Sequence, residues 1–145
     1  MSKSTSADTL RVLTFDFGLK RIGVAVGQTL TSTAQPLAPI KANDGIPGWQ
    51  DIERLVNEWQ PDAFLVGLPL NMDGSESDMS LRAKKFGNRL HGRLHKPIHF
   101  YDERLSSFEA KGLVISQGGD RDFGRNSVDG VAATLIFESW ASARH

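Results

Sequence analysis

The sequence predicts an α/β domain in which helices flank a mixed, five-stranded β-sheet. Three extended segments come first and form a meander, and helical and strand patterns then alternate along the chain. A meander followed by β-α units gives a mixed sheet with helices on its faces. The length of 145 residues suits one domain with a sizeable core. We therefore expect a disordered polar tail at residues 1–9 and a single domain at residues 10–145.

The meander is predicted from three stretches in the first third of the chain. Residues 10–17 and 22–27 are apolar, with β-branched members, and a short turn joins them as in a β-hairpin. Residues 33–41 form a third extended stretch that contains Pro36 and Pro39. Because proline cannot donate a hydrogen bond to a neighbouring strand, these two residues indicate the edge of the sheet.

The alternating part begins with a predicted helix at 47–59, where apolar residues recur at the spacing of one buried helical face. Residues 63–68 are a short, continuous apolar run, typical of a central strand that is covered on both faces. A second helix is predicted at about 75–93 and the last strand at 97–101.

The end of the chain is predicted to be helical. Ser106 and Glu109 match a capping box, which indicates the start of a helix. The glycine-rich stretch at 118–124 predicts a mobile loop. The final helix is expected at about 127–142, with an apolar face toward the core.

The helix at 75–93 has two stripes at helical spacing, one apolar and one basic. The apolar stripe comprises Met79, Ala83, Phe86 and Leu90, and the basic stripe comprises Arg82, Lys85, Arg89 and Arg93. A solvated helix face would explain the basic stripe. However, residues 82–96 contain no acid that could pair with these cations within the helix, whereas a phosphate backbone could.

The composition excludes several classes of protein. The chain has no cysteine, so it forms neither disulfides nor thiolate metal sites. Its N-terminus lacks the apolar region of a secretory signal, and no apolar run could span a bilayer, so we expect a cytoplasmic protein without membrane contact. The net charge is zero, yet residues 1–81 carry 6 basic and 10 acidic side chains while residues 82–145 carry 11 and 7. A local basic patch is therefore possible.

Carboxylates lie at three places where a strand or a helix would present them: Asp16, the pair Asp102 and Glu103, and Asp129. Carboxylate oxygens are the ligands of hard divalent cations such as Mg²⁺. Each group also has an ordinary structural alternative, namely a turn, the N-terminus of a helix, and a helix cap, respectively. Because Asp102 and Glu103 are consecutive, they point to opposite faces, and the pattern leaves open which one reaches the site.

These segments together resemble the YqgF family, also called RuvX, of ribonuclease H-like proteins. The resemblance covers about residues 10–142 and rests on four motifs in this order: Phe15–Gly27, Val66–Gly74, Asp102–Ser107 and Ser127–Ala133. The family is similar to Holliday-junction resolvases in fold and is assigned to maturation of the 5′ end of 16S ribosomal RNA in bacteria. The resemblance therefore implies a ribonuclease H-like fold and a nuclease activity.

The resemblance also implies a set of site residues. Asp16, Glu103 and Asp129 correspond to the catalytic, metal-binding acids, with Asp102 as an alternative ligand. Ribonuclease H-like nucleases commonly carry an acid near the end of the fourth strand, and here that strand ends in Gly67–Pro69 without one. The second acid is then expected from the pair Asp102 and Glu103. We expect Mg²⁺ or Mn²⁺ as cofactor, as two ions that clamp the reacting phosphate.

Further residues are expected to shape the cleft and to bind the substrate. The cleft-lining residues are Gly18, Gly67, Leu68 and Pro69. The cations expected to hold phosphates are Lys20, Arg21 and Arg104 near the acids, and Arg82, Lys85, Arg89 and Arg93 on the helix.

The expected partner is RNA, namely pre-ribosomal RNA within a pre-ribosomal particle, and the expected oligomeric state is a monomer or a homodimer. Two alternatives stay open. One is a Holliday-junction resolvase that acts on branched DNA. The other is a non-catalytic RNA- or ribosome-binding module with the same fold. Metal-dependent cleavage by the purified protein distinguishes the enzymes from the binding module.

Overall fold

The structure is a computed structural model that describes residues 9–105 and 121–144, with only the helical backbone described for 121–129. The strands are β1 (Arg11–Asp16), β2 (Arg21–Gln28), β3 (Thr33–Asn43), β4 (Ile46–Pro47), β5 (Ala63–Leu68) and β6 (Ile98–Asp102). The helices are α2 (Trp49–Trp59), α3 (Asp78–Leu94) and α5 (Arg121–Ala143), and a 3₁₀ turn, η1 (Glu103–Leu105), follows β6.

The strands form one mixed sheet in the order β4-β3-β2-β1-β5-β6. The meander β1–β4 is antiparallel, whereas β5 lies parallel to β1 and β6 lies parallel to β5. The predicted mixed α/β architecture is thus confirmed, but the sheet has six strands and not five. The sequence pattern missed β4 because two residues, which pair only with Ala42 and Asn43, are too few to show a strand period.

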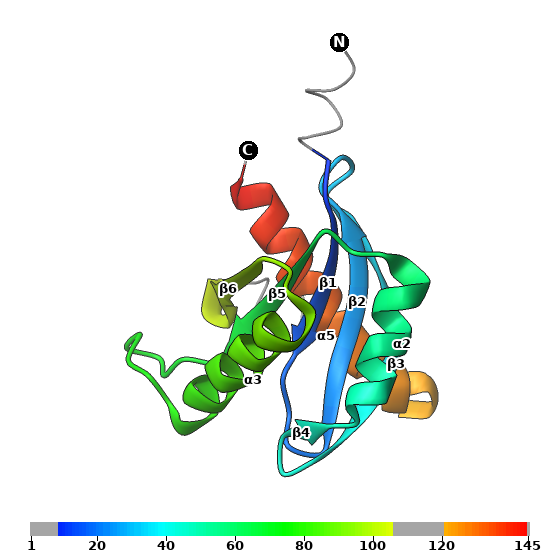
Figure 1. Ribbon diagram of the computed structural model, residues 1–145. Helices are drawn as coiled ribbons and strands as arrows, with labels where there is room; N and C mark the ends of the chain where they lie inside the picture. Colours follow the sequence, from blue (N-terminus) through cyan, green and yellow to red (C-terminus); the bar gives the residue numbers. More distant parts are fainter. Residues whose placement is uncertain (1–8, 106–120, 145) are drawn as a thin grey trace.

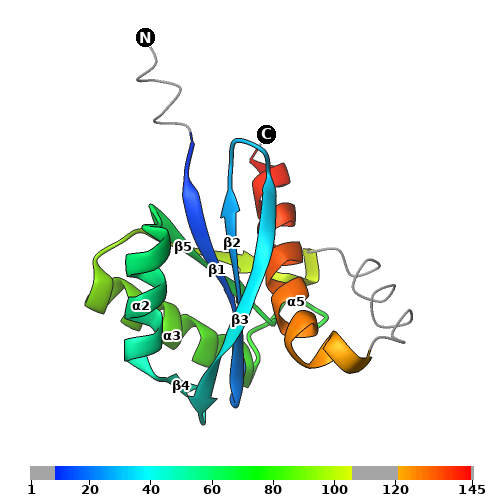
Figure 2. The same cartoon turned by 90° about the vertical axis from the view of Figure 1, so that its right-hand side faces the viewer.

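Helices cover both faces of the sheet, with α2 and α3 on one face and α5 on the other (Figures 1 and 2). The alternation of strand residues divides the core accordingly. Leu13 and Phe15 of β1 belong to the cluster on the α2/α3 face, whereas Val12 packs with Ile136 and Phe137 of α5. All six residues of β5 are buried, as expected for a central strand. The edge position of Pro36 and Pro39 is also confirmed, because β4 does not extend along that part of β3.

All three described helices start at other residues than the pattern predicted. The helix α2 starts at Trp49 and not at residue 47, because Pro47 belongs to β4. The helix α3 starts at Asp78 and not at about residue 75, because Ser77 is its cap and accepts a hydrogen bond of 2.9 Å from the backbone N–H of Ser80. The helix α5 starts at Arg121 and not at about residue 127, so residues 121–124 are helical and do not belong to a loop. A glycine lowers helix propensity but does not forbid a helix.

Some of the expectations concern parts of the chain that the structure does not describe. The predicted capping box at Ser106 and Glu109, and all of the N-terminal tail except Thr9, lie outside the described residues. Within the described residues, none of the helices combines the length and the apolar character needed to cross a membrane.

Candidate active site

The acids of interest gather where the parallel strands end. Because β1, β5 and β6 run in the same direction, their carboxyl ends share one edge of the sheet. Asp16 is the last residue of β1, and Glu103 is the first residue after β6. Both side chains are half-buried. The fold therefore brings together two acids that lie 87 positions apart in the sequence.

The register of the sheet places Asp16 beside Gly67. Phe15 is the parallel partner of Val66, so the next residues along each strand are Asp16 and Gly67. Successive side chains in a strand point to opposite faces, and Val12 faces α5. Asp16, four positions further along β1, therefore also lies on the α5 face.

Gly67 makes room for the side chain of Glu103. A Cβ atom at position 67 would lie 2.8 Å from Cγ and 3.0 Å from Oε2 of Glu103, and 2.7 Å from Cδ1 of Ile136 in α5. These separations are shorter than ordinary carbon contacts, so a Cβ atom here would displace the side chain of Glu103 or Ile136, whereas glycine leaves room for both. Glu103 thus lies against β5 on its α5 face, the same face to which strand alternation assigns Asp16.

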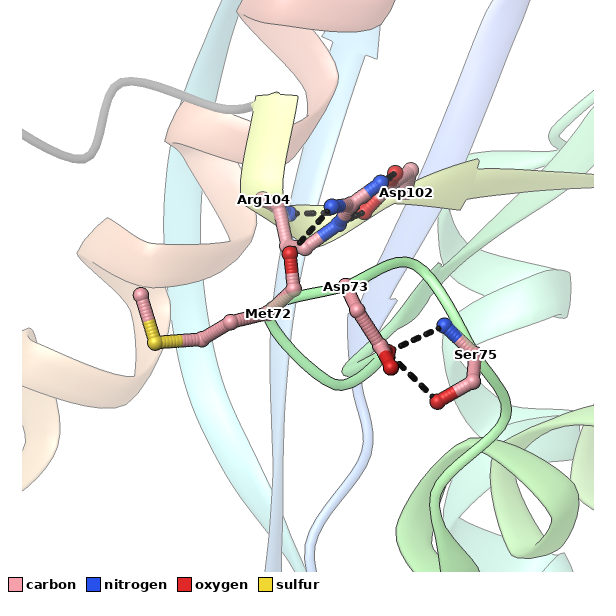
Figure 3. Close-up of polar contacts among 5 residues, drawn as sticks. All are labelled: Met72, Asp73, Ser75, Asp102 and Arg104. Carbon is pink, nitrogen blue, oxygen red and sulfur yellow. Dashed lines mark hydrogen bonds and ion pairs between the residues drawn. The ribbon is translucent and has the colours of Figure 1, made fainter.

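Asp102 has a different environment, although it directly precedes Glu103. Its carboxylate accepts hydrogen bonds from the guanidinium of Arg104, at 3.1 Å from Nε and 2.6 Å from Nη2, and one of 2.9 Å from the Arg104 backbone N–H (Figure 3). The Asp102 side chain is only 18% exposed. The hydrogen bonds from the Arg104 guanidinium hold the pKa of Asp102 below its ordinary value. The carboxylate oxygens of Asp102 are therefore both occupied by hydrogen bonds from Arg104.

Arg104 also anchors the loop between β5 and α3. Its Nη1 donates a hydrogen bond of 2.9 Å to the carbonyl oxygen of Met72. Within this loop, Asp73 accepts hydrogen bonds from the backbone N–H and the hydroxyl of Ser75, at 2.9 and 2.6 Å (Figure 3). The Ser75 hydroxyl bond is the main reason why the pKa of Asp73 is lowered. Arg104 was predicted to bind phosphate. In the structure its guanidinium donates hydrogen bonds to Asp102 and to the carbonyl oxygen of Met72.

A second set of hydrogen bonds joins α5 to the turn that carries Glu103. The hydroxyl groups of Tyr101 and Ser139 lie 2.8 Å apart, and Ser139 donates a hydrogen bond of 2.9 Å to the carbonyl oxygen of Leu105. The turn η1 is therefore held from two sides, by Arg104 toward the β5–α3 loop and by Ser139 toward α5.

Asp129 lies within α5, eight positions after its first residue Arg121. An aspartate so far into a helix does not cap it, so the capping alternative for Asp129 is wrong. The helix α5 covers the face on which Glu103 lies. The side chain of Asp129 is outside the described part of the structure. Among the described side chains, no group of three or more histidines and acids could hold a metal ion.

The other predicted site residues have mixed surroundings. Lys20 is exposed in the turn that follows Asp16, and Arg21 is exposed at the start of β2. Gly18 belongs to this turn, where a Cβ atom would lie 2.3 Å from the carbonyl oxygen of Arg21. Leu68 belongs to the hydrophobic cluster on the α2/α3 face. The carbonyl oxygen of Pro69 accepts a hydrogen bond of 2.6 Å from the hydroxyl of Ser77. Of the four predicted cleft residues, Gly67 lies against Glu103, and Leu68 is paired with Asp102 in the register of β5 and β6.

The four cations of the predicted stripe on α3 are exposed, but they have different contacts. Arg82 pairs with Asp44 at 3.2 Å, and the guanidinium of Arg93 lies 4.4 Å from the ring centre of Trp49. Lys85 and Arg89 line a hollow next to the turn between β3 and β4. The helical spacing indicates partners only within the helix and so gave no sign of Asp44, which a distant turn supplies.

Sequence reasoning also missed the role of Arg104 as an anchor. Its spacing of two residues from Asp102 was available as a signal, because an aspartate can accept the backbone N–H two positions further on. The contact of Arg104 with the Met72 carbonyl had no such signal, since it depends on how a loop folds.

One known family matches almost the whole chain. The model of the family described as "RuvX: Holliday junction resolvase" matches residues 10–143. The chain belongs to the RuvX family. RuvX membership confirms the resemblance seen in the sequence and classes the chain as a hydrolase, a nuclease that acts on phosphodiester bonds.

Two similar RuvX relatives are proteins of Marinobacter nauticus and Aeromonas hydrophila, both named "Putative pre-16S rRNA nuclease". The first is 61% identical over 130 residues, which cover 90% of this chain and 91% of the relative. The second is 56% identical over 134 residues, which cover 92% of this chain and 96% of the relative.

Solved structures share the fold at low identity. RuvC of T. thermophilus in complex with a Holliday junction substrate matches with a TM-score of 0.54 and 16% identity, over 92% of this chain and 96% of RuvC. The Holliday junction resolvase of yeast mitochondria matches with a TM-score of 0.52 and 13% identity, over 90% of this chain and 77% of the resolvase. These matches confirm the predicted ribonuclease H-like fold.

Proposed function

We propose that this chain is a divalent-metal-dependent endonuclease that processes the 5′ end of pre-16S ribosomal RNA, with Asp16, Glu103 and Asp129 as its metal-binding acids. The observation that carries the proposal is the contact of Glu103 with Gly67. This contact supports a site at the carboxyl edge of the sheet, because the register brings Asp16 next to the same glycine. The names of the RuvX relatives support pre-16S ribosomal RNA as the substrate.

The residues at this edge fit a hard divalent cation. Both acids offer oxygen ligands, which Mg²⁺ and Mn²⁺ prefer. Two half-buried acids on one face of a sheet repel each other unless a cation or a hydrogen bond compensates for their charge. When bound, a divalent cation supplies Lewis-acid stabilisation of the charge that develops on the phosphoryl oxygens.

The residues of the chain itself would position the substrate and the acids. Lys20 and Arg21 follow Asp16 and are exposed, so they would attract a phosphate group of the RNA toward the end of β1. Asp102 and Arg104 would keep η1, and with it Glu103, in place against β5. We assign Asp102 to this positioning role and not to metal binding, since its oxygens already accept hydrogen bonds from Arg104.

A second candidate function is the resolution of branched DNA. The description of the RuvX family model as a Holliday junction resolvase favours it. A resolvase cuts two strands across a junction and so requires two sites, as a homodimer would provide. The same acids would serve either substrate, and a substrate comparison is therefore the discriminating test.

The test is a cleavage assay with the purified full chain. The substrates are a labelled RNA with the 5′ leader of 16S ribosomal RNA and a labelled four-way DNA junction, each with Mg²⁺, Mn²⁺ or EDTA. We expect metal-dependent cleavage of the RNA, and a loss of at least about 10²-fold in Asp16→Asn, because this change removes a charged ligand and keeps the size.

The matched control for this assay is Asp62→Asn. Asp62 directly precedes β5 and so lies at the other end of this strand from the proposed site. Its carboxylate accepts a hydrogen bond from the backbone N–H of Arg11, and the side-chain oxygen of an asparagine can accept the same bond. The control removes the same charge and should cleave like the wild type. Preferential cleavage of the junction would establish the second candidate. The absence of cleavage of either substrate would leave only a binding module.

A further inference from the structure

A hollow of about 350 Å³ lies between α3 and the turn that joins β3 to β4. Its apolar lining includes the side chains of Phe17 and Phe86, which are almost fully buried, and Ile46, which is 52% exposed. Gly45 completes this side with a φ of +84°, and a Cβ atom there would lie 2.8 Å from the ring of Phe17. Glycine at this position therefore keeps the hollow open.

The charged lining of the hollow is mainly basic. Its single acid, Asp44, pairs with Arg82 at 3.2 Å. Lys85 and Arg89 line the hollow four positions apart on α3, and neither side chain forms a hydrogen bond or an ion pair with another described residue. Like charges at this spacing destabilise a helix slightly. A bound anion would relieve that repulsion, so the hollow is complementary to a phosphate group.

The hollow lies close to the proposed acids along the chain but opens on the other face. Phe17 lines the hollow and directly follows Asp16. Phe17 belongs to the core cluster on the α2/α3 face, whereas strand alternation assigns Asp16 to the α5 face. One nucleic acid that passes over this corner of the sheet could therefore contact both.

We propose that this hollow is a second phosphate-binding site, which holds the backbone of the RNA strand at a distance from the bond to be cleaved. Lys85 and Arg89 bind the phosphate, and Ile46 provides an apolar contact for the adjoining sugar. The inference rests on the proposed function in that the ligand is the RNA substrate. It adds a subsite that contributes to the affinity for RNA and not to the cleavage step.

The test is a salt titration of RNA binding by the full chain. A fluorescein-labelled single-stranded RNA is bound in EDTA, so that no cleavage occurs, and the affinity is measured by anisotropy over a NaCl series. In Lys85→Ala, Arg89→Ala the slope of log affinity against log salt should fall by about 0.7 for each phosphate that the protein no longer neutralises. Lys85→Arg, Arg89→Lys should keep the slope, since the charges remain.

The matched control is the double variant Arg54→Ala, Lys84→Ala. It also removes two cations, but these pair with Asp51 and Glu76 and lie outside the hollow. We expect the wild-type slope in this control. An equal fall in both double variants, or no fall in either, would overturn the proposal, because global charge or another surface would then explain the binding.

The outcome can be separated from that of the cleavage assay. If the wild type cleaves RNA and Lys85→Ala, Arg89→Ala keeps the slope, the subsite is wrong and the nuclease stands. If the wild type does not cleave RNA but the slope falls in that variant alone, the subsite stands and the proposed processing of RNA is wrong. With both correct, the variant has a raised KM and an unchanged kcat.

Discussion

The two faces of the sheet differ in charge at the corner where β1 ends. The α5 face has Glu103 against Gly67 and, by strand alternation, Asp16. The α3 face has the hollow with Lys85 and Arg89. The consecutive residues Asp16 and Phe17 divide between these two environments. Asp102 and Glu103 are also consecutive, but Asp102 pairs with Arg104 while Glu103 lies against Gly67. Because successive side chains in a strand point to opposite faces, one residue of such a pair can take part in the chemistry while its neighbour contributes to binding or supports the fold.

The largest expected effect comes from closing the space beside Glu103. In Gly67→Ala the new Cβ atom would lie 2.8 Å from Glu103 and 2.7 Å from Ile136, so the side chains of Glu103 and Ile136 must shift. Cleavage should fall by about 10²-fold, since displacements near 1 Å have such effects. The free energy of unfolding should fall by about 1–3 kcal/mol. Kinetics and urea unfolding measure the two effects.

Gly92→Ala is the control for this substitution. Gly92 lies in α3, and a Cβ atom there would meet nothing within 4 Å. Alanine should therefore stabilise the helix, by about 0.5–1 kcal/mol, and leave cleavage unchanged. A Gly67→Ala protein with full activity and wild-type stability would show that Glu103 does not depend on this space.

A smaller effect is expected from Asp102, the acid that supports η1. Because the Arg104 hydrogen bonds lower its pKa in the folded protein below the ordinary 3.8, Asp102 stabilises the fold above that value. This stabilisation is lost as the pH falls through the lowered pKa. Asp102→Asn should therefore be less stable than the wild type at neutral pH, and the difference should shrink in acid. Urea unfolding over a pH series measures it.

Asp51→Asn is a suitable comparison for Asp102→Asn. Asp51 also pairs with an arginine, Arg54 at 3.1 Å, but the side chains of Arg54 and Asp51 are 71% and 45% exposed. Such surface pairs contribute little, so this variant should unfold like the wild type at neutral pH. If Asp102→Asn behaved in the same way, Arg104 would not be an anchor of η1.

The smallest effect is expected beneath the acids on the α5 face. Thr14 is fully buried, and its hydroxyl has no hydrogen-bond partner among the described residues. Thr14→Val should stabilise the protein by up to about 1 kcal/mol, because an unpaired buried hydroxyl is unfavourable. Thr134→Val should instead destabilise it by about 0.5–1.5 kcal/mol, since Thr134 donates a hydrogen bond of 2.6 Å to Val131. A destabilised Thr14→Val would mean that an ordered water binds the hydroxyl.

The sequence was sufficient for most of the fold because its strands have clear patterns. The apolar run at 63–68 predicted β5 with the bounds that the structure has, and the prolines predicted the edge at β3. The pattern failed where elements are very short, as in β4, or where polar residues are helical, as at the start of α5.

The candidate site could be predicted only as a set of residue types. Strand parity could not choose between Asp102 and Glu103, because the choice depends on the bonds of Arg104 and on the space at Gly67. Likewise, only the turn that carries Asp44 distinguishes Arg82 from Lys85 and Arg89. Contacts between segments far apart in the sequence decided each of these cases.

The central claim is that Asp16 and Glu103 hold a divalent cation, and a Mn²⁺ titration tests it most directly. Calorimetry and the melting temperature are compared for three proteins: the wild type, the double variant Asp16→Asn, Glu103→Gln, and the charge-matched double variant Asp51→Asn, Asp62→Asn, whose two acids lie away from the site. Mn²⁺ at about 100 times its Kd should stabilise the wild type and the matched control by about 2.7 kcal/mol. The Asp16→Asn, Glu103→Gln protein should bind no Mn²⁺ in this range and show no shift. Equal Mn²⁺ binding by all three proteins would contradict the account.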